Sequence, residues 1–178
     1  MARSLDCTGF TRLLDVAGGS GIYACAVVAK HPHLEATVFE KPPVDGVACK
    51  AIEKRNFENR VSVIAGDMLK QELPPGFDLH LISNVLHDWD ELIVKELLAK
   101  SFRALKPGGM LVIHDACINE TKSGPLPVAK YSALLMHSTE GKCYSLGEMR
   151  GYLTEVGFIG MTFQETAADR SIIIVRKP

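Results

Sequence analysis

Short apolar runs alternate with longer amphipathic stretches along most of this chain. Five apolar runs predict strands: Thr11 to Val16, Glu35 to Glu40, Val61 to Gly66, Phe77 to Val85 and Met110 to Asp115. Helical patterns lie between them, at Ile22 to Lys30, Val44 to Arg55 and Asp90 to Leu105. The last has apolar positions at Leu92, Ile93, Leu97, Leu98, Phe102 and Leu105. Strands that alternate with helices at this spacing predict a parallel sheet covered on both faces.

The last third of the chain has a different pattern. Two helices are expected, Val128 to His137 and Leu146 to Val156, and Ser145 with Glu148 forms a capping-box pattern before the second. Two strands follow, Ile159 to Glu165 and Ser171 to Arg176. Their polar connection is too short for a helical crossover, so they must pair antiparallel. We therefore predict an α/β fold with a doubly wound, mostly parallel seven-stranded sheet and a C-terminal antiparallel hairpin.

A glycine-rich turn, Gly18-Gly19-Ser20-Gly21, follows the first strand and its terminal Asp15. A strand, such a turn and a helix N-terminus form the entry to a nucleotide-type site. The glycine spacing differs from the dinucleotide fingerprint, and no Lys-Ser/Thr pair follows as in a P-loop. The turn therefore favours a nucleoside cofactor without phosphates, although many such turns are glycine-rich for packing alone.

Polar residues recur at the carboxyl ends of the predicted parallel strands, where ligands bind in open α/β sheets. They are Asp15, Glu40, Asp67 with Met68, Ser83 with Asn84, and Asp115. Glu40 is suited to accept hydrogen bonds from two ribose hydroxyls, Asp67 from an exocyclic amine, and Met68 to lie against adenine. Each acid taken singly could equally be a solvated strand end or a helix cap. Their repetition at one edge favours a site.

His87 follows the fourth predicted strand, at the same edge of the sheet. Its Nε2 could take a proton from a substrate hydroxyl if a carboxylate fixed its tautomer, and Asp115 is the candidate. His80, His114 and His137 are interpreted as packing residues. Trp89 could form a pocket wall or belong to the core.

The predicted helix Val128 to His137 could line a substrate pocket. Tyr131 and Met136 are its candidates for the lining, and Leu134 with Leu135 is expected to pack.

Composition narrows the class of protein. The 178 residues fit one domain, and a net charge of −1 argues against an extended nucleic-acid surface. No apolar run approaches the roughly 20 residues of a membrane span, and no secretory signal is visible. Five widely spaced cysteines predict reduced thiols in a cytoplasmic protein. No His/Asp cluster has metal-ligand spacing, so no metal site is expected.

Six segments, taken in order, resemble one known family. They are Leu-Asp-Val-Ala-Gly-Gly-Ser-Gly, Val-Phe-Glu-Lys-Pro, Ala-Gly-Asp-Met, Leu-His-Asp-Trp-Asp, Leu-Lys-Pro-Gly-Gly and Glu-Met-Arg-Gly-Tyr-Leu. Over nearly its whole length the chain resembles the catalytic domain of S-adenosylmethionine-dependent small-molecule O-methyltransferases, of the plant phenolic and bacterial natural-product type. The resemblance implies a Rossmann-like class I fold, S-adenosylmethionine as cofactor, S-adenosylhomocysteine as product and a phenolic or enolic hydroxyl as acceptor.

The resemblance also implies roles for single residues. Gly18, Gly19 and Gly21 would approach the methionine part of the cofactor, Glu40 would hold the ribose, and Asp67 with Met68 would bind adenine. His87 would be the general base and Asp115 its orienting partner. Ser83 stands where many members have Lys, so that contact is left in doubt.

Two departures from the family pattern stand out. Cys143 replaces a Glu that is a second partner of the histidine, so either Asp115 suffices or the base is oriented differently. Only some ten residues precede the first strand, so the family's N-terminal dimerisation and substrate-lid domain is not seen. We expect residues 1–178 to be the cofactor-binding catalytic domain of a longer protein, which would form the homodimer.

Two other classes of protein are alternatives to an O-methyltransferase. A cofactor-binding module without catalysis is opposed by the pair His87 and Asp115 and favoured by Cys143 together with the absent N-terminal domain. An NAD-dependent dehydrogenase is disfavoured by the glycine spacing and by the C-terminal hairpin. The identity of the acceptor, and transfer to oxygen rather than nitrogen or carbon, stay open.

Overall fold

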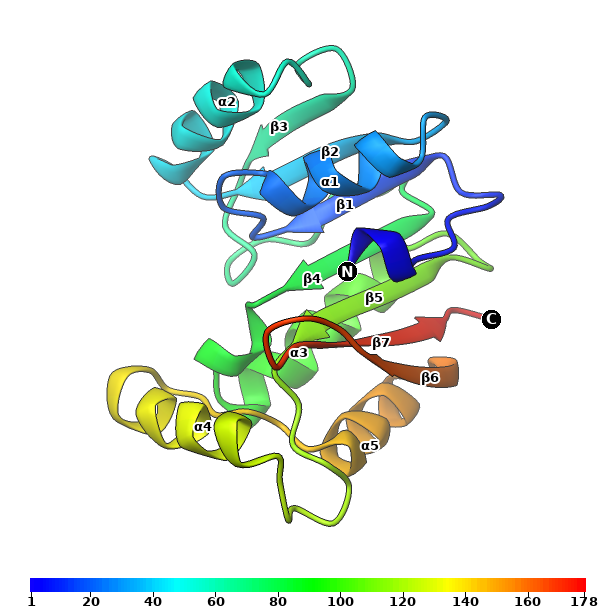
Figure 1. The fold of residues 1–178 in the computed structure, drawn as a ribbon. Helices are drawn as coiled ribbons and strands as arrows, with labels where there is room; N and C mark the ends of the chain where they lie inside the picture. Colours follow the sequence, from blue (N-terminus) through cyan, green and yellow to red (C-terminus); the bar gives the residue numbers. More distant parts are fainter.

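A seven-stranded sheet forms the centre of the protein in the computed structural model, which describes residues 1–178 (Figure 1). The strands are β1 (Arg12–Val16), β2 (Glu35–Glu40), β3 (Val61–Ala65), β4 (Leu79–Ser83), β5 (Met110–Asp115), β6 (Ile159–Glu165) and β7 (Ser171–Arg176). Their order is β3-β2-β1-β4-β5-β7-β6. The first five are parallel, whereas β7 runs antiparallel to both β5 and β6. The predicted mixed sheet with its terminal hairpin is confirmed.

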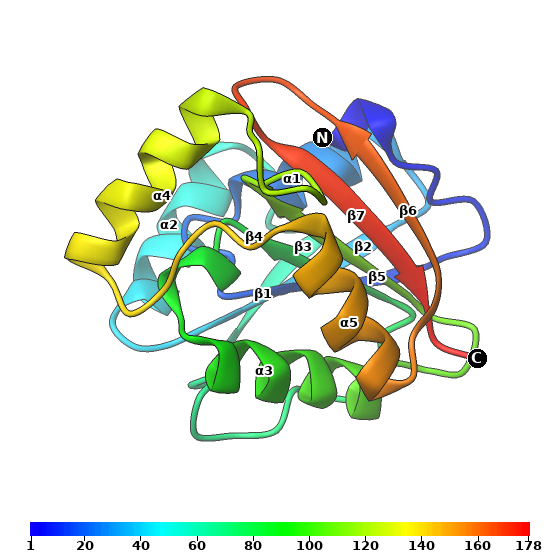
Figure 2. The ribbon, with the colours of Figure 1, turned by 90° about the horizontal axis from the view of Figure 1, so that it is seen from below.

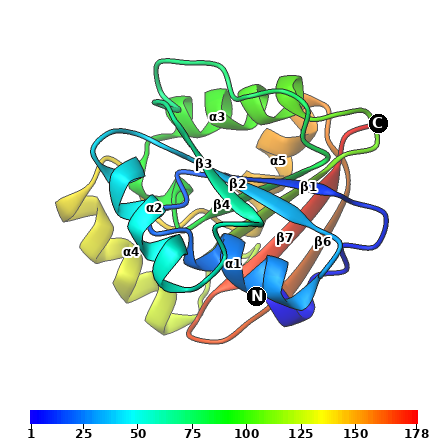
Figure 3. The ribbon, with the colours of Figure 1, turned by 90° about the horizontal axis from the view of Figure 1, so that it is seen from above.

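Five α-helices and two short 3-10 helices accompany the sheet. They are α1 (Ile22–Lys30), α2 (Val44–Lys54), α3 (Glu91–Ala104), α4 (Leu126–Ser138), α5 (Leu146–Val156), η1 (Ala2–Ser4) and η2 (Leu86–Asp88). Helices α1 and α2 cover one face of the sheet, and α3 and α5 cover the other (Figures 2 and 3). Helix α4 lies apart from these layers, beside the end of β4.

The period-two alternation of strand side chains sends residues to two separate cores. Leu13 of β1 packs with Val27 and Val28 of α1, while the adjacent Leu14 packs with Leu97 and Leu98 of α3. Because both faces are covered, the central strands β1, β4 and β5 are almost entirely buried.

Local signals define the helix ends. The Asp90 carboxylate accepts a hydrogen bond from the Ile93 amide at 2.9 Å and so caps α3. The predicted capping box is confirmed at α5, where Ser145 and Glu148 bond reciprocally. Gly157 ends that helix in the left-handed region, at φ 109°.

Some expectations about single positions were wrong. Leu92 is 78% exposed, whereas Lys100 of the same helix is only 6% exposed, because the buried stripe of α3 is shifted by part of a turn. On α4, Leu135 packs as expected, but Leu134 and Met136 are exposed. Strand β4 is also shorter than predicted, because the chain turns into η2 after Ser83.

The strand order places a topological switch point between β1 and β4. From β1 the chain builds outward through β2 to β3, and then returns to add β4 and β5 on the other side. The loops after β1 and β4 therefore diverge at the carboxyl edge, which is where open α/β sheets bind ligands. No helix of the chain has the length and apolar character needed to cross a membrane.

Candidate functional site

The glycine turn after β1 is shaped by the residue beneath it. A Cβ atom at Gly18 would lie 2.5 Å from Oδ2 of Asp15, so no larger residue fits above that carboxyl. Gly19 has φ +56° and open space on its Cβ side. The turn thus allows a close approach of its backbone, and its Gly19 amide donates to the Glu40 carboxylate.

Asp15 is a fully buried acid with no hydrogen-bond partner for either carboxyl oxygen. Burial raises the pKa of Asp15 to about 7; the Ala24 amide, which lies near the carboxyl group without forming a hydrogen bond of good geometry, opposes this, and the charge of Glu40 adds to it. Asp15 was predicted as a cofactor residue, and the structure places its side chain under the turn, covered by Gly18.

A cleft of about 190 Å³ opens at the switch point. Its lining residues are Ala17, Phe39, Glu40, Lys41, Gly66, Asp67, Met68, Leu69, Asn84, Val85, Asp88 and Trp89. Glu40 ends β2 at the edge of this cleft, where its Oε2 accepts from the Gly19 amide and its Oε1 from the Lys41 amide, both at 2.9 Å. The acid of β2 is thereby tied to the glycine turn of β1.

The loop after β3 lines the cleft next to Glu40, because β3 pairs with β2 and the Gly66 amide donates to the Glu40 carbonyl oxygen at 2.9 Å. Asp67 Oδ1 accepts from the Leu69 amide at 2.9 Å, and this bond holds the pKa of Asp67 below its usual range. Lys100 of α3 fixes the same loop from below: its Nζ donates to the carbonyl oxygens of Met68 at 2.7 Å and Leu69 at 3.0 Å. A buried ammonium with these carbonyl partners holds the loop in place.

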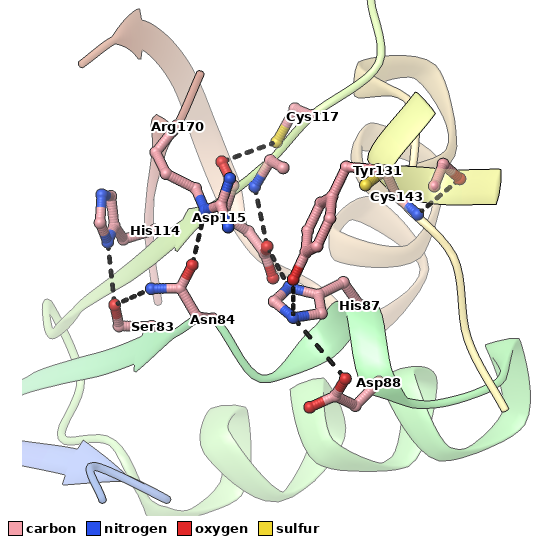
Figure 4. A network of polar contacts seen from close by, with 12 residues as sticks. Ser83, Asn84, His87, Asp88, His114, Asp115, Cys117, Tyr131, Cys143 and Arg170 are labelled. Carbon is pink, nitrogen blue, oxygen red and sulfur yellow. Dashed lines mark hydrogen bonds and ion pairs between the residues drawn. The ribbon is translucent and has the colours of Figure 1, made fainter. Parts of the chain in front are cut away.

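His87 lies in η2 and faces Asp115 at the end of β5 (Figure 4). The His87 Nδ1 and Asp115 Oδ1 atoms are 2.5 Å apart, and the same oxygen accepts from the Ala116 amide at 2.7 Å. With the Nδ1 proton directed to Asp115, Nε2 carries the free lone pair. His87 and Asp115, called the dyad below, are 5% exposed each.

Opposing influences act on the basicity of His87. Burial lowers the pKa of His87, but the hydrogen bond and charge of Asp115, with the charge of Asp88, outweigh it, so the net shift is upward. Cys143 is buried, and burial raises its thiol pKa to about 11. Asp115 is thus the carboxylate that contacts Nδ1.

Ser83 and Asn84 form a polar chain beside the dyad. Ser83 Oγ lies 2.8 Å from His114 Nδ1, because β4 pairs with β5 at these two residues. Asn84 Nδ2 donates to Ser83 Oγ at 3.2 Å and to the hydroxyl of Tyr23 at 3.3 Å. Burial lowers the pKa of His114 to about 4, so this histidine is neutral at pH 7. Ser83 therefore supports Asn84, which is the one of the pair that lines the cleft.

The structure brings most of the predicted residues to one edge of the sheet. Glu40, Asp67, Met68 and Asn84 line the cleft, and the dyad lies beside it. Three polar residues were missed: Lys100, Arg170 and, as a contact of the histidine, Tyr131. Lys100 had a usable signal, since it lies three residues after Leu97 on the buried side of α3. Arg170 had none, because turn arginines are ordinarily solvated.

Fold and site together define an α/β protein with a cleft at the carboxyl edge of its sheet, beside a buried histidine–carboxylate pair. A family model described as an O-methyltransferase domain matches residues 1–159. The chain belongs to this O-methyltransferase family.

Known members show how similar the chain is to its relatives. A 3-hydroxy-5-methyl-1-naphthoate 3-O-methyltransferase from Streptomyces sahachiroi is 34% identical over 88% of this chain and 46% of its own length. An O-methyltransferase family 2 protein from Planctomyces limnophilus, solved with apigenin, has a TM-score of 0.93 at 38% identity, covering 99% of this chain and 56% of that one. Human N-acetylserotonin methyltransferase, solved with S-adenosylmethionine, has a TM-score of 0.90 at 30% identity, and the match covers 99% of this chain and 50% of the human one. The chain spans about half the length of these relatives.

We predict that Asp15 makes stability depend on pH. Its pKa of about 7 in the folded protein exceeds the 3.8 of a free aspartate. Between these two pH values the folded state therefore binds a proton that the unfolded state has lost. The free energy of unfolding should therefore fall as pH rises through this window, by roughly 2–4 kcal/mol from this group. Urea unfolding from pH 5 to 8 should show Asp15→Asn gaining stability relative to wild type.

The exposed Glu58→Gln is the matched control and should follow the wild-type pH dependence. Parallel curves for wild type and Asp15→Asn would contradict the shifted pKa of Asp15.

Proposed function

We propose that this chain binds S-adenosylmethionine in the cleft and transfers its methyl group to a hydroxyl of a small phenolic or enolic acceptor. The observation that carries the proposal is the dyad: a histidine whose Nδ1 is held by a buried carboxylate, so that its Nε2 can accept a proton, beside a cleft that three further acids line. Family membership and the S-adenosylmethionine bound to the human relative support it.

The residues of the cleft fit an adenosyl group. Phe39, Met68 and Trp89 provide apolar walls, and Glu40 and Asp67 provide acceptors at the ends of the neighbouring strands β2 and β3. Glu40 would hold the ribose hydroxyls, and Asp67 with Met68 the adenine. The turn at Gly18, Gly19 and Gly21 would approach the methionine part, with Asp15 buried beneath it. Bound there, the cofactor would supply an electrophilic methyl group on a sulfonium sulfur.

The dyad would make the acceptor nucleophilic. Nε2 of His87 would take the hydroxyl proton as the oxygen attacks, and Asp115 would stabilise the resulting imidazolium while holding the ring in place. Orientation of the two reactants would supply much of the remaining acceleration. A homodimer is proposed only for a longer chain.

Calorimetric titration should show saturable binding of S-adenosylmethionine and S-adenosylhomocysteine but not of NAD. Glu40→Ala and Asp67→Ala should each weaken binding at least about tenfold, because each removes a charge-assisted acceptor. Glu35→Ala, at the exposed opposite end of β2, is the matched control and should bind as wild type. Binding of NAD instead would support an NAD-dependent dehydrogenase. Absence of binding of any of the three compounds would contradict the proposed cofactor.

Methyl transfer can be followed with labelled S-adenosylmethionine and two acceptors named for relatives, 3-hydroxy-5-methyl-1-naphthoate and N-acetylserotonin. His87→Ala should lower the rate by roughly 10²–10⁴ and leave cofactor binding nearly unchanged, whereas His33→Ala should have no effect. The wild-type rate should rise with pH to a plateau, with a midpoint above the usual 6.5, since Asp115 raises the pKa of His87.

Asp115→Asn should lower both that midpoint and the plateau, because the charge that favours the imidazolium is lost. Transfer by His87→Ala within a few-fold of wild type would rule out the general base. Cofactor binding without transfer to any acceptor would favour a module that binds the cofactor without catalysis.

A further inference from the structure

The turn between β6 and β7 lies at the same edge of the sheet as the dyad, although its strands run antiparallel to β5. Because β7 is antiparallel to β5, its first residue, Ser171, pairs with Asp115, the last residue of β5. Arg170, one residue earlier, is therefore held over the carboxyl edge, where Figure 4 shows it between Asn84 and Tyr131. A parallel strand at this place would start at the opposite edge, so the hairpin is what brings this arginine to the site.

Arg170 makes two contacts there. Its Nε donates to Asn84 Oδ1 at 2.6 Å, and its guanidinium carbon lies 4.9 Å from the centre of the Tyr131 ring. No carboxylate lies within ion-pairing distance of Arg170, so its charge is directed to the aromatic face. The guanidinium thus ties the ring of α4 to the end of β4.

Tyr131 in turn contacts the atom that the proposed reaction needs. Its hydroxyl is 3.1 Å from Nε2 of His87, and the two rings meet edge to face with centres 5.5 Å apart. Burial raises the pKa of Tyr131 although the charge of Arg170 opposes it, so the phenol stays protonated at pH 7. With Nδ1–H directed to Asp115, the phenol donates to Nε2.

We propose that Tyr131, held by Arg170, occupies the place of the acceptor hydroxyl on His87 Nε2 and must release that atom when the acceptor binds. Nε2 has one lone pair, and a phenol is a member of the proposed acceptor class, so the two hydroxyls compete for one hydrogen bond. The inference rests on the proposed methyl transfer, which identifies the competing hydroxyl as the acceptor's.

The position of Tyr131 on α4 allows such a release. This helix packs through a small cluster of Ala116, Val128, Leu135 and Cys143, and most of its other side chains are exposed. Its contacts with the rest of the fold are far sparser than those of α3 or α5. Movement of this helix or of the Tyr131 ring would therefore disturb little of either main core.

The contact can be measured without turnover, by NMR titration of the histidine ring protons, with His87→Asn assigning the signal. The charged and titratable groups that face His87 are Asp115 on β5, Asp88 on η2, Tyr131 on α4, Arg170 on the hairpin turn, and Cys117 and Tyr144 nearby. Tyr131→Phe should raise the pKa of His87 by about half a unit, because a donor that favours the neutral ring is lost.

A double-mutant cycle tests whether Arg170 acts by holding Tyr131 against His87. Arg170→Lys keeps the charge but loses the planar donor, so it should raise the pKa of His87 in the same direction, and it should add nothing in the Tyr131→Phe background. Arg176→Lys is the matched control. Arg176 lies on the same hairpin as Arg170 but away from the dyad, and its guanidinium carbon is 4.6 Å from the centre of the Phe10 ring. Additive shifts, or no rise in Tyr131→Phe, would overturn the proposal.

Kinetics give the second readout. Tyr131→Phe should lower KM for the acceptor about three- to tenfold, with the Kd of S-adenosylmethionine unchanged, because the competing hydrogen bond is gone. A merely structural role would raise KM, and such a rise would overturn the proposal. If the NMR shifts appear but wild type transfers no methyl group to any acceptor, the proposed function fails and the Tyr131–His87 contact stands.

Discussion

Every functional contact in this protein depends on strands that end together at one edge of the sheet. The ladders from β2 through β1 and β4 to β5 are parallel and in register, so Glu40, Asn84 and Asp115 arrive at the same edge from distant parts of the chain. No single loop could hold these groups so rigidly, because each is fixed by a strand buried on both faces. The antiparallel hairpin adds the one element that reaches the edge from the opposite direction.

Burial and pairing divide the charges of this edge into two kinds. Asp15 is buried without a partner, and its pKa is raised to about 7. Asp115 is almost as deeply buried but accepts from His87 and from the Ala116 amide. The donors satisfy the oxygen of Asp115 that faces His87, whereas burial without a partner favours the neutral form of Asp15. The two acids thus have opposite chemistry although both end parallel strands.

Much of the fold could be predicted from the sequence because its signals are local. Pro107-Gly108-Gly109, Gly157 and the Ser145–Glu148 capping box mark boundaries that the structure reproduces. The strand-end acids and His87 could also be found, since the carboxyl edge follows from parallel pairing alone. Three residues act through contacts with partners far away along the chain: Lys100 contacts Met68, Tyr131 contacts His87 and Arg170 contacts Asn84, at separations of 32, 44 and 86 residues. No local pattern carries such pairings, so these residues required the folded structure.

Hydrogen exchange of backbone amides, with and without S-adenosylhomocysteine, tests most directly that the carboxyl edge is the cofactor site. Slower exchange is expected in the loop at residues 66–69, which lines the cleft, and in the glycine turn at residues 17–21, which borders the cleft at Ala17 and is bonded to Glu40 through the Gly19 amide. The open groove between α3 and α5, lined by Leu92 and Glu155, should exchange unchanged. Protection confined to that groove, or absent from the glycine turn at saturating ligand, would contradict the account.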